Sequence, residues 1–379
     1  MNRRKAIDYT FAAQRSVYRF PKLTYIGVYI NFWIIANLLL VTIINLISKT
    51  LTETLDISIT GRLGPLVLTA VIVGLFYGLG LGLASYYLDR TVYKRWSIGK
   101  VILFKAVGSL VLLSILFWFI KEVLYVEVIA PSLSLPLIVD ENSWKYLFLL
   151  LLVYYFFLSV LISFITQINN KYGPGVLLPL LFGRYKTPQE EDRIFMFMDL
   201  KLSTTIAETL GHLKYSAFIR DCFEDINDVL SSFYVQVYQY VGDEIVVSWP
   251  TGEGIKEHRC IRFYFACKKQ FQERATYYET NYGMLPEFKA GMHSGIVSAV
   301  EIGKIKKDIA YHGDVLNIAA RVQSICNEYG RSFLVSSYLL EKMGAHSGMV
   351  TETIGNILLK GKSIPTEIIS VEDFEGALG

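Results

Sequence analysis

Four long apolar segments in the first half of the chain restrict its fold more than any other feature. A helix that crosses the hydrocarbon core of a bilayer needs about 20 consecutive apolar residues. Windows of that length, each with few charges, are Tyr25–Ile47, Gly64–Leu88, Val101–Ile120 and Tyr146–Ile165. One such window also suits a buried core helix, but four in succession predict an α-helical membrane domain with four spans over residues 25–165.

Basic residues beside the spans predict the orientation of the chain. Lys and Arg in short flanking segments favour the cytoplasmic side of a membrane. The N-terminal tail, residues 1–24, and the segment between the second and third spans are rich in them: Arg3, Arg4, Lys5, Arg15, Arg19, Lys22, Arg90, Lys94, Arg95 and Lys100. The other two connecting segments carry a near-neutral mixture of charges. We therefore expect an integral, multi-pass protein of the plasma or inner membrane with both termini in the cytoplasm.

The charge balance and the cysteine and histidine content argue against several classes of protein. The chain of 379 residues carries 37 basic and 34 acidic residues, a net charge of +3. Because its basic residues gather beside the spans, we expect contact with the lipid bilayer and none with nucleic acid. The five histidines form no ligand-like pairs, so zinc is not expected. The four cysteines match no metal-binding spacing and are expected to be reduced thiols: Cys222, Cys260, Cys267 and Cys326.

The second half of the chain changes to alternating strand and helix patterns. Residues 166–192 form a connector with Gly173-Pro174-Gly175, a short apolar run and many charges. Residues 193–379 predict an α+β domain with a mixed sheet. The expected strands are Ile194–Leu200, Tyr234–Tyr240, Glu244–Trp249, Glu287–Ser294, Gly295–Ile302, Phe333–Ser336, Val350–Ile354 and Glu367–Val371. The expected helices are Thr204–His212, Tyr215–Ser232, Glu257–Asn281 and Val315–Glu328.

Two aspartates follow apolar strand residues in this half. Asp199 closes the first strand, and Asp243 lies in the turn of the hairpin sequence YQYVGDEIVVSW. Two carboxylates a few ångströms apart repel each other unless a cation lies between them. Mg²⁺ prefers one or two carboxylates together with phosphate oxygens and water, and a pair of such ions catalyses in-line phosphoryl displacement. Each Asp alone also suits a solvated strand end, and the adjacent Glu244 gains no role from this argument.

Two further segments carry residues that suit phosphate chemistry. Ser203 and Thr204 follow the first strand, where such residues are ordinary N-caps of a helix. A strand-to-helix turn also presents N–H groups that suit a triphosphate. Asn317 and Arg321 are four residues apart, hence on one helix face, although an ordinary helix has the same spacing. A guanidinium at that place is able to stabilise charge that develops during phosphoryl transfer.

Three motifs in this order resemble the class III nucleotidyl cyclase domain: FMFMDL at 195–200, VGDE at 241–244 and GDVLNIAAR at 313–321. The resemblance covers Ile194–Val371 and implies a palm-like, ferredoxin-like α+β domain with a mixed, largely antiparallel sheet. The activity it implies is cyclisation of a nucleoside triphosphate to the 3′,5′-cyclic nucleotide and pyrophosphate. It also implies two Mg²⁺ or Mn²⁺ ions held by Asp199, Asp243 and the Leu200 carbonyl. Asn317 would orient the ribose, and Arg321 would stabilise the transition state.

The same resemblance implies a homodimer, because sites in that family form between two catalytic domains. Asp199 and Asp243 would then come from one chain, and Asn317 and Arg321 from the other. The chain departs from adenylyl cyclases at the two positions that read the base: Gln239 replaces a lysine, and Ala310 replaces Asp or Thr. Leu202 and Ser203 also replace a Gly-Phe pair after the first aspartate. ATP is the substrate that the family favours, and GTP or a pyrimidine nucleotide is the alternative.

Three other functions fit parts of the pattern. A cyclase-like domain that senses nucleotide without catalysis would suit Gln239 and Ala310, but it would have no chemical need for Asp199, Asp243, Asn317 and Arg321 together. A diguanylate cyclase would carry two glycines before the acids of the hairpin and would lack the later NIAAR helix. A membrane transporter is disfavoured because the spans contain few charges.

Overall fold

The computed structural model describes residues 20–55, 63–92, 96–122, 140–172, 183–304, 307–344, 348–358 and 365–374. The chain forms two compact units, one over residues 20–177 and one that contains residues 178–379. Each unit is described by itself below.

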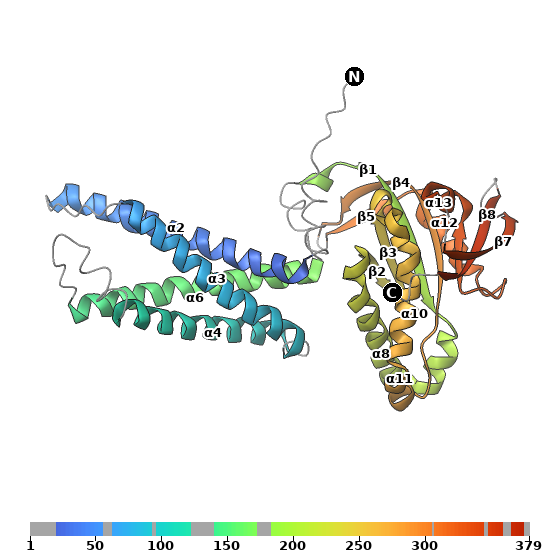
Figure 1. Ribbon diagram of the computed structural model, residues 1–379, viewed down its shortest axis with the longest axis horizontal. Helices are drawn as coiled ribbons and strands as arrows, with labels where there is room; N and C mark the ends of the chain where they lie inside the picture. Colours follow the sequence, from blue (N-terminus) through green and yellow to red (C-terminus); the bar gives the residue numbers. More distant parts are fainter. Residues whose placement is uncertain are drawn as a thin grey trace, which may run out of the picture. The chain divides into compact units, whose positions relative to one another are not determined.

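The first unit consists of long helices that lie side by side: α2 (Pro21–Leu55), α3 (Leu63–Thr91), α4 (Ile98–Phe119) and α6 (Glu141–Tyr172) (Figure 1). Within the described residues, four helices are long and apolar enough to cross a membrane, over Lys22–Thr54, Gly64–Asp89, Ile98–Glu122 and Glu141–Asn169. Many large apolar side chains on them are exposed, among them Ile35, Phe76, Trp118 and Phe157. The four predicted apolar helices are therefore confirmed, and their outward surface suits a lipid surrounding.

Aromatic and polar side chains fill the centre of the helical unit. The buried ring of Trp33 lies 4.5 Å from the ring of Tyr77 and 4.9 Å from that of Tyr155, centroid to centroid. The Tyr77 hydroxyl donates to the Ser109 carbonyl at 2.6 Å, and the Tyr155 hydroxyl donates to the Asn37 amide oxygen at 2.6 Å. Because these residues come from all four helices, the cluster joins the whole bundle.

An ion pair joins three of the same helices. Lys105 of α4 places its Nζ 2.7 Å and 2.9 Å from the two carboxylate oxygens of Asp89 on α3. The hydroxyl of Tyr25 on α2 donates to the same carboxylate at 2.6 Å. Only 8% of Lys105 is exposed, so its ammonium group pairs with Asp89 within the protein.

A single sheet organises the second unit, with the strand order β2-β3-β1-β4-β6-β8-β7 and β5 paired to β4. Its strands are β1 (Gln189–Leu200), β2 (Gln236–Val241), β3 (Glu244–Pro250), β4 (Phe288–Ile302), β5 (Asp308–His312), β6 (Phe333–Ser336), β7 (Met349–Ile357) and β8 (Thr366–Phe374). The β4–β6 pair is parallel, and the other pairs between described strands are antiparallel. The predicted mixed, largely antiparallel sheet is confirmed.

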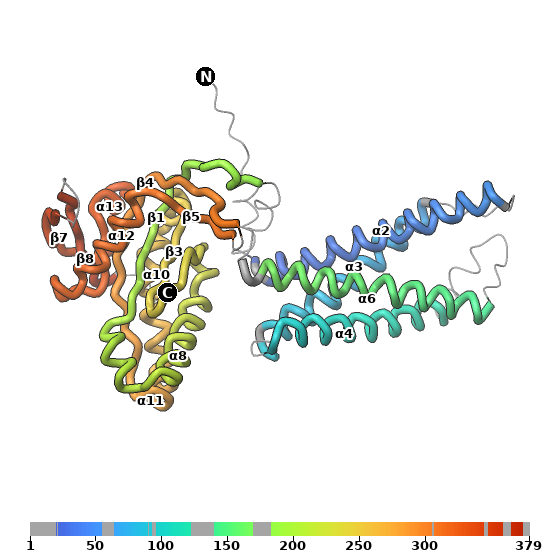
Figure 2. The backbone as a smooth tube through the Cα atoms, turned by 180° about the vertical axis from the view of Figure 1, so that it is seen from behind, coloured from blue at the N-terminus to red at the C-terminus, as the bar shows by residue number. Residues whose placement is uncertain are grey.

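Helices cover both faces of this sheet, as Figures 1 and 2 show from opposite sides. One face packs against α8 (Ser203–Leu230), α10 (Arg259–Glu273), α11 (Ala275–Tyr282) and α13 (Ser337–Met343), and the other packs against α12 (Asp314–Ser324). Along β1, Ile194, Met196 and Met198 enter the first core while Phe195 enters the second, as the period of two in a strand requires. The shorter elements are α9 (Thr251–Gly254) and the 3₁₀ turns η3 (Arg184–Lys186), η4 (Ser231–Phe233) and η5 (Lys256–His258).

Several helices and strands begin or end at residues other than those that the sequence predicts. The two strands expected to meet at Gly295 form one strand, β4. Glycine at this position leaves room for the Val315 side chain of α12, since a Cβ on residue 295 would lie 2.8 Å from it. Strand β5 was not expected. The long helix expected over Glu257–Asn281 is divided at Arg274 into α10 and α11. The helices expected over Thr204–His212 and Tyr215–Ser232 join as α8 across a kink at Gly211, whose φ is +71°.

The ends of the predicted connector take regular structure. Helix α6 runs on to Tyr172, and β1 begins at Gln189. The apolar run of the connector at 176–182 lies outside the described residues.

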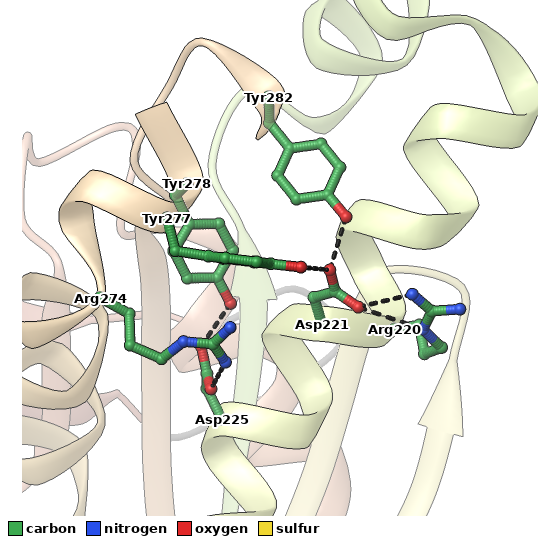
Figure 3. A network of polar contacts seen from close by, with 7 residues as sticks. All are labelled: Arg220, Asp221, Asp225, Arg274, Tyr277, Tyr278 and Tyr282. Carbon is green, nitrogen blue, oxygen red and sulfur yellow. Dashed lines mark hydrogen bonds and ion pairs between the residues drawn. The ribbon is translucent and has the colours of Figure 1, made fainter. Parts of the chain in front are cut away.

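A buried polar network ties α8 to α11 (Figure 3). The Asp221 carboxylate accepts hydrogen bonds from Tyr277 at 2.7 Å, from Tyr282 at 2.5 Å and from Arg220 at 2.8 Å. Burial acts to raise the pKa of Asp221, but the bonds from Tyr282, Tyr277 and Arg220 together lower it. The neighbouring Asp225 accepts from Tyr278 at 2.5 Å and pairs with Arg274. Asp221 is therefore held in its charged form against α11.

All four cysteines are free and buried, as expected from their spacing. Burial raises the pKa of Cys326 to about 12, and it raises the pKa of Cys222, Cys260 and Cys267 further. These thiols are core residues, and their raised pKa values favour the protonated form, which is not the nucleophilic one.

Candidate active site

Strand pairing brings the acidic residues together at one end of the sheet. Asp199 of β1 is the direct partner of Glu244, the first residue of β3, and Asp243 precedes Glu244 in the turn. Burial and then the charges of Asp199 and Asp243 raise the pKa of Glu244 to about 7, while Lys289 opposes this shift. The two predicted carboxylates thus act on the same side chain, and Glu244, which received no role from the sequence, belongs to the cluster.

Two residues that sequence reasoning missed hold Asp199. Lys289, the β4 partner of Asp199 in the strand register, places its Nζ 3.2 Å from the Asp199 carboxylate. The side-chain amide of Gln323 on α12 donates to the same carboxylate at 3.1 Å. Gln323 comes this close because Gly291 on β4 has no side chain; a Cβ there would meet the Gln323 backbone nitrogen at 2.1 Å. Lys289 could be found from the sequence only with the strand register, because the register places Lys289 opposite Asp199.

The donor set at this end of the sheet fits a divalent cation. Asp243 is half-buried and has no hydrogen-bond or ion-pair partner among the described residues. Leu200 ends β1 with its side chain in the core, which leaves its main chain as the part able to face a ligand. Over the described ranges no three His, Cys, Asp or Glu side chains form a metal-holding group. The arrangement therefore suits an ion that takes two carboxylates and completes its shell with backbone, phosphate or water oxygens.

The turn after β1 differs from the simple N-cap expectation. Leu202, not Ser203 or Thr204, occupies the N-cap position of α8, and no side chain caps the helix there. Leu202 takes a left-handed conformation with a φ of +55° and is 77% exposed. Ser203 begins the helix and faces Tyr215, whose pKa is raised by burial and by Asp243 and lowered by Ser203. The turn therefore places Ser203 beside the acidic cluster, whereas Thr204 is exposed.

Gln239 and Ala310 lie on two strands that are not neighbours in the sheet. Gln239 is exposed on β2, directly after an irregularity in the β2–β3 register, and Ala310 is buried on β5. Their chain neighbours touch: the rings of Tyr238 and Tyr311 lie 5.3 Å apart. The two positions are thus joined through adjacent tyrosines.

Asn317 and Arg321 of α12, unlike Gln323, have no contact with the acidic cluster of their own chain among the described residues. Val315, Ala319 and Val322 are buried against the sheet, whereas Asn317 is exposed and Arg321 is half-buried. Neither Asn317 nor Arg321 has a side-chain partner among the described residues. Within one chain, then, Asp199 and Asp243 come together but Asn317 and Arg321 do not join them.

Comparison with known proteins finds relatives of the second unit. Residues 186–370 match the sequence model of the family described as the adenylate and guanylate cyclase catalytic domain. "Adenylate cyclase 2" of Rhizobium meliloti (strain 1021) is 32% identical over 220 residues, which cover 58% of this chain and 61% of that protein. The adenylate cyclase of Anabaena cylindrica is 22% identical over 182 residues, 47% of this chain and 36% of that protein. The chain thus spans less than two thirds of the length of these relatives.

Solved structures with a related fold include two bacterial enzymes. The adenylyl cyclase CyaB from P. aeruginosa has a TM-score of 0.45 and 17% identity, and the match covers 51% of this chain and all of that one. A bacterial light-regulated adenylyl cyclase has a TM-score of 0.48 and 20% identity, with 57% and 64% covered. The likeness depends on the sequence matches, by which residues 186–370 are similar to the adenylate and guanylate cyclase catalytic domain; within the described residues this segment follows four apolar helices.

Proposed function

We propose that this protein is a membrane-bound class III nucleotidyl cyclase that acts as a homodimer and converts ATP to 3′,5′-cyclic AMP and pyrophosphate. The observation that carries the proposal is the pairing of Asp199 with Glu244, the neighbour of Asp243, beside Lys289 at one end of the sheet. The four apolar helices would anchor the domain in the bilayer, with both termini in the cytoplasm as the flanking basic residues favour.

In the proposed reaction the ribose 3′ oxygen attacks the α-phosphorus, and the bond from that phosphorus to the pyrophosphate oxygen breaks. Asp199, Asp243 and the Leu200 carbonyl would hold two Mg²⁺ or Mn²⁺ ions, which when bound supply charge neutralisation and activation of the attacking hydroxyl. The turn at Ser203 and Thr204 would contact the triphosphate through its N–H groups. Asn317 would orient the ribose, and Arg321 would donate to the phosphoryl oxygens as negative charge develops.

The direction in which Asn317 and Arg321 point supports a site shared between two chains. Both lie on the face of α12 turned away from β1, so they are available to a partner subunit. Gln239 and Ala310 occupy the base-facing positions, and Gln239 is able both to donate to and to accept from a base edge. The adenylate cyclase relatives favour ATP over GTP or a pyrimidine nucleotide.

Product analysis of the full chain tests the proposal. Purified protein in detergent is incubated with Mn²⁺ and each of ATP, GTP, CTP and UTP, and the cyclic product is identified by mass. Cyclic AMP is expected as the main product, and Asp243→Asn, which keeps the shape of the side chain but removes its charge, is expected to abolish it. Tight nucleotide binding with no cyclic product from any of the four would instead support a nucleotide-sensing domain without catalysis.

A further inference from the structure

A buried arginine holds three strands of the cyclase domain together. Arg193 of β1 is only 2% exposed. Its Nη1 donates to the Glu191 carboxylate at 2.9 Å, and its Nη2 donates to the Ser248 hydroxyl of β3 at 2.7 Å and to the Gln236 side chain of β2. A planar guanidinium with several fixed donors is suited to such a junction, and a lysine would be unable to reproduce it.

The same guanidinium lies against β5. Its central carbon is 4.8 Å from the centre of the Tyr311 ring, a distance typical of a cation–π contact. The Tyr311 ring in turn lies 5.4 Å from Phe195 and 5.3 Å from Tyr238. Because Tyr311 follows Ala310 and Tyr238 precedes Gln239, Arg193 supports the aromatic cluster that joins the two base-facing positions.

The other end of this chain of contacts reaches the connector. Tyr185 of η3 is buried, and its hydroxyl donates to the Glu191 carboxylate at 3.2 Å. Burial and the Glu191 charge raise the pKa of Tyr185, so its hydroxyl keeps its proton and remains a donor. Contacts therefore run without a gap from Tyr185 through Glu191 and Arg193 to Tyr311.

We propose that Arg193 is a positioning residue for the nucleobase edge of the site, and that Tyr185 places this edge under the control of the connector. The inference depends on the proposed function, since it takes Gln239 and Ala310 as the positions that face the base. A buried guanidinium is strongly destabilised when it loses its partner, so a shift of Tyr185 and Glu191 must be followed by Arg193. Arg193 would then carry the shift to the Tyr311 ring and to β5.

Substitutions of Tyr311 in the full chain test the positioning role. Tyr311→Leu removes the ring beneath Arg193, whereas Tyr311→Phe keeps it and serves as the matched control. Loss of a contact of this kind is expected to raise the KM for ATP about 5-fold and to reduce the preference for ATP over GTP, with kcat within about 2-fold. Tyr234→Leu provides a second control, because Tyr234 lies beneath another arginine, Arg259, at 4.3 Å. Neither control should change KM or base preference.

Substitution of Tyr185 tests the link to the connector. Tyr185→Phe removes only the hydroxyl and is expected to raise KM in the same direction by about 2-fold. In the double variant with Tyr311→Leu the increase should not exceed that of Tyr311→Leu alone, because both act through Arg193. The inference would be overturned if Tyr185→Phe and Tyr311→Leu lowered kcat equally and left KM unchanged. It would also be overturned if their effects on KM were fully additive in the double variant.

A binding measurement separates this inference from the proposed function. The dissociation constant of a non-cyclisable ATP analogue is compared across the same variants, with thermal unfolding as the check that each is folded. If the wild-type chain binds the analogue but makes no product, the proposed catalysis fails while the positioning role is still tested by the affinities. If Tyr311→Leu binds the analogue as tightly as Tyr311→Phe does, the positioning role fails.

Discussion

Lys289 and Asp199 face each other across β4 and β1 as register partners, and their charged groups lie 3.2 Å apart. The lysine ammonium therefore partly compensates the carboxylate that the proposed metal would use. Lys289 also lowers the pKa of Glu244 against the effects of burial, Asp199 and Asp243. The Lys289 ammonium and a divalent cation would therefore compete for the negative charge of Asp199.

Removal of this lysine should tighten metal binding. Lys289→Met is expected to lower the Mn²⁺ concentration that half-saturates the protein about 10-fold, since two opposite unit charges at this distance attract each other by about 1 kcal/mol even at the dielectric constant of water. The measurement is the thermal shift of the nucleotide-free chain during a Mn²⁺ titration. Lys307→Met, which removes a lysine paired with Glu301 at 2.8 Å, should leave the midpoint unchanged. Weaker binding in Lys289→Met would show that the lysine helps to form the site.

Shared sites predict that two inactive variants complement each other. Asp243→Ala and Arg321→Ala chains should each be inactive, because every site of either homodimer lacks one essential group. In a symmetric dimer formed by random pairing, co-expression should restore about a quarter of the wild-type activity, since half of the dimers then carry one intact site of two. The initial rate of cyclic nucleotide formation by membranes with matched protein content is the measurement. A co-expressed pair as inactive as its parents would indicate that each site belongs to one chain.

Glycine in place of Leu202 should stabilise the cyclase domain. A left-handed conformation costs a non-glycine residue about 1–2 kcal/mol, and Leu202 is exposed, so its side chain contributes little packing. After the larger entropy of glycine in the unfolded chain is included, we expect a net gain of about 0.5–1 kcal/mol in the free energy of unfolding. The matched control is Leu213→Gly in α8, where Leu213 is 90% exposed; this change should cost about 1 kcal/mol. Urea denaturation of the solubilised chain distinguishes the two signs.

Asp221 predicts a pH dependence of stability. An unfolded aspartate has a pKa of about 3.9, and hydrogen bonds from Tyr282, Tyr277 and Arg220 lower the folded value. The stabilisation is therefore fully present above the unfolded pKa and is lost as the pH falls through the lower folded pKa. Asp221→Asn should reduce the free energy of unfolding by about 2 kcal/mol at pH 7, and this difference from wild type should shrink as the pH is lowered below 4.

Two variants that each remove one hydrogen bond to Asp221 serve as the comparison for Asp221→Asn. Tyr277→Phe and Tyr282→Phe each remove one hydroxyl donor and should each cost about 1 kcal/mol. The stabilities are measured by urea denaturation between pH 7 and pH 3. A difference between wild type and Asp221→Asn that does not change with pH would mean that the carboxylate charge does not stabilise this network.

The Asp89–Lys105 ion pair predicts compensation between two variants of the helical unit. Asp89→Asn leaves the buried Lys105 ammonium without its counter-charge and should cost about 3 kcal/mol, seen as a lower thermal midpoint in detergent. The double variant Asp89→Asn/Lys105→Met removes both charges and should recover most of the loss. If the double variant is as unstable as Asp89→Asn, the loss comes from the Tyr25 hydrogen bond to Asp89 instead of the ion pair.

The outline of the fold was predictable from the sequence because its signals are local. The four apolar windows, the short apolar run Ile194–Leu200 and the Gly242 hairpin depend only on neighbouring residues. What the sequence did not predict depends on tertiary contacts: β4 runs through Gly295 because α12 packs closely there, and α8 includes the kink at Gly211. Strand β5 was missed because its sequence of five residues is too short to predict a strand and becomes one through pairing with the end of β4.

In the candidate site, too, local sequence predicted some residues, and others depend on tertiary contacts. Asp199 and Asp243 were predicted because each marks the end of an apolar strand. Lys289 and Gln323 were missed because their proximity to Asp199 depends on the strand register and on the room left by Gly291. The expected N-cap at Ser203 was wrong by one residue, since Leu202 takes the left-handed cap conformation for which its residue type gives no signal.

The burial of all four native thiols makes this chain a ready host for site-directed labelling. Maleimide and methanethiosulfonate reagents need an accessible thiolate, and Cys222, Cys260, Cys267 and Cys326 offer neither access nor an acidic thiol. A single cysteine introduced at an exposed place, such as Leu213 in α8, would therefore carry a spin label or fluorophore against a silent background. Distances between such probes would test the proposed dimer in the otherwise unaltered protein.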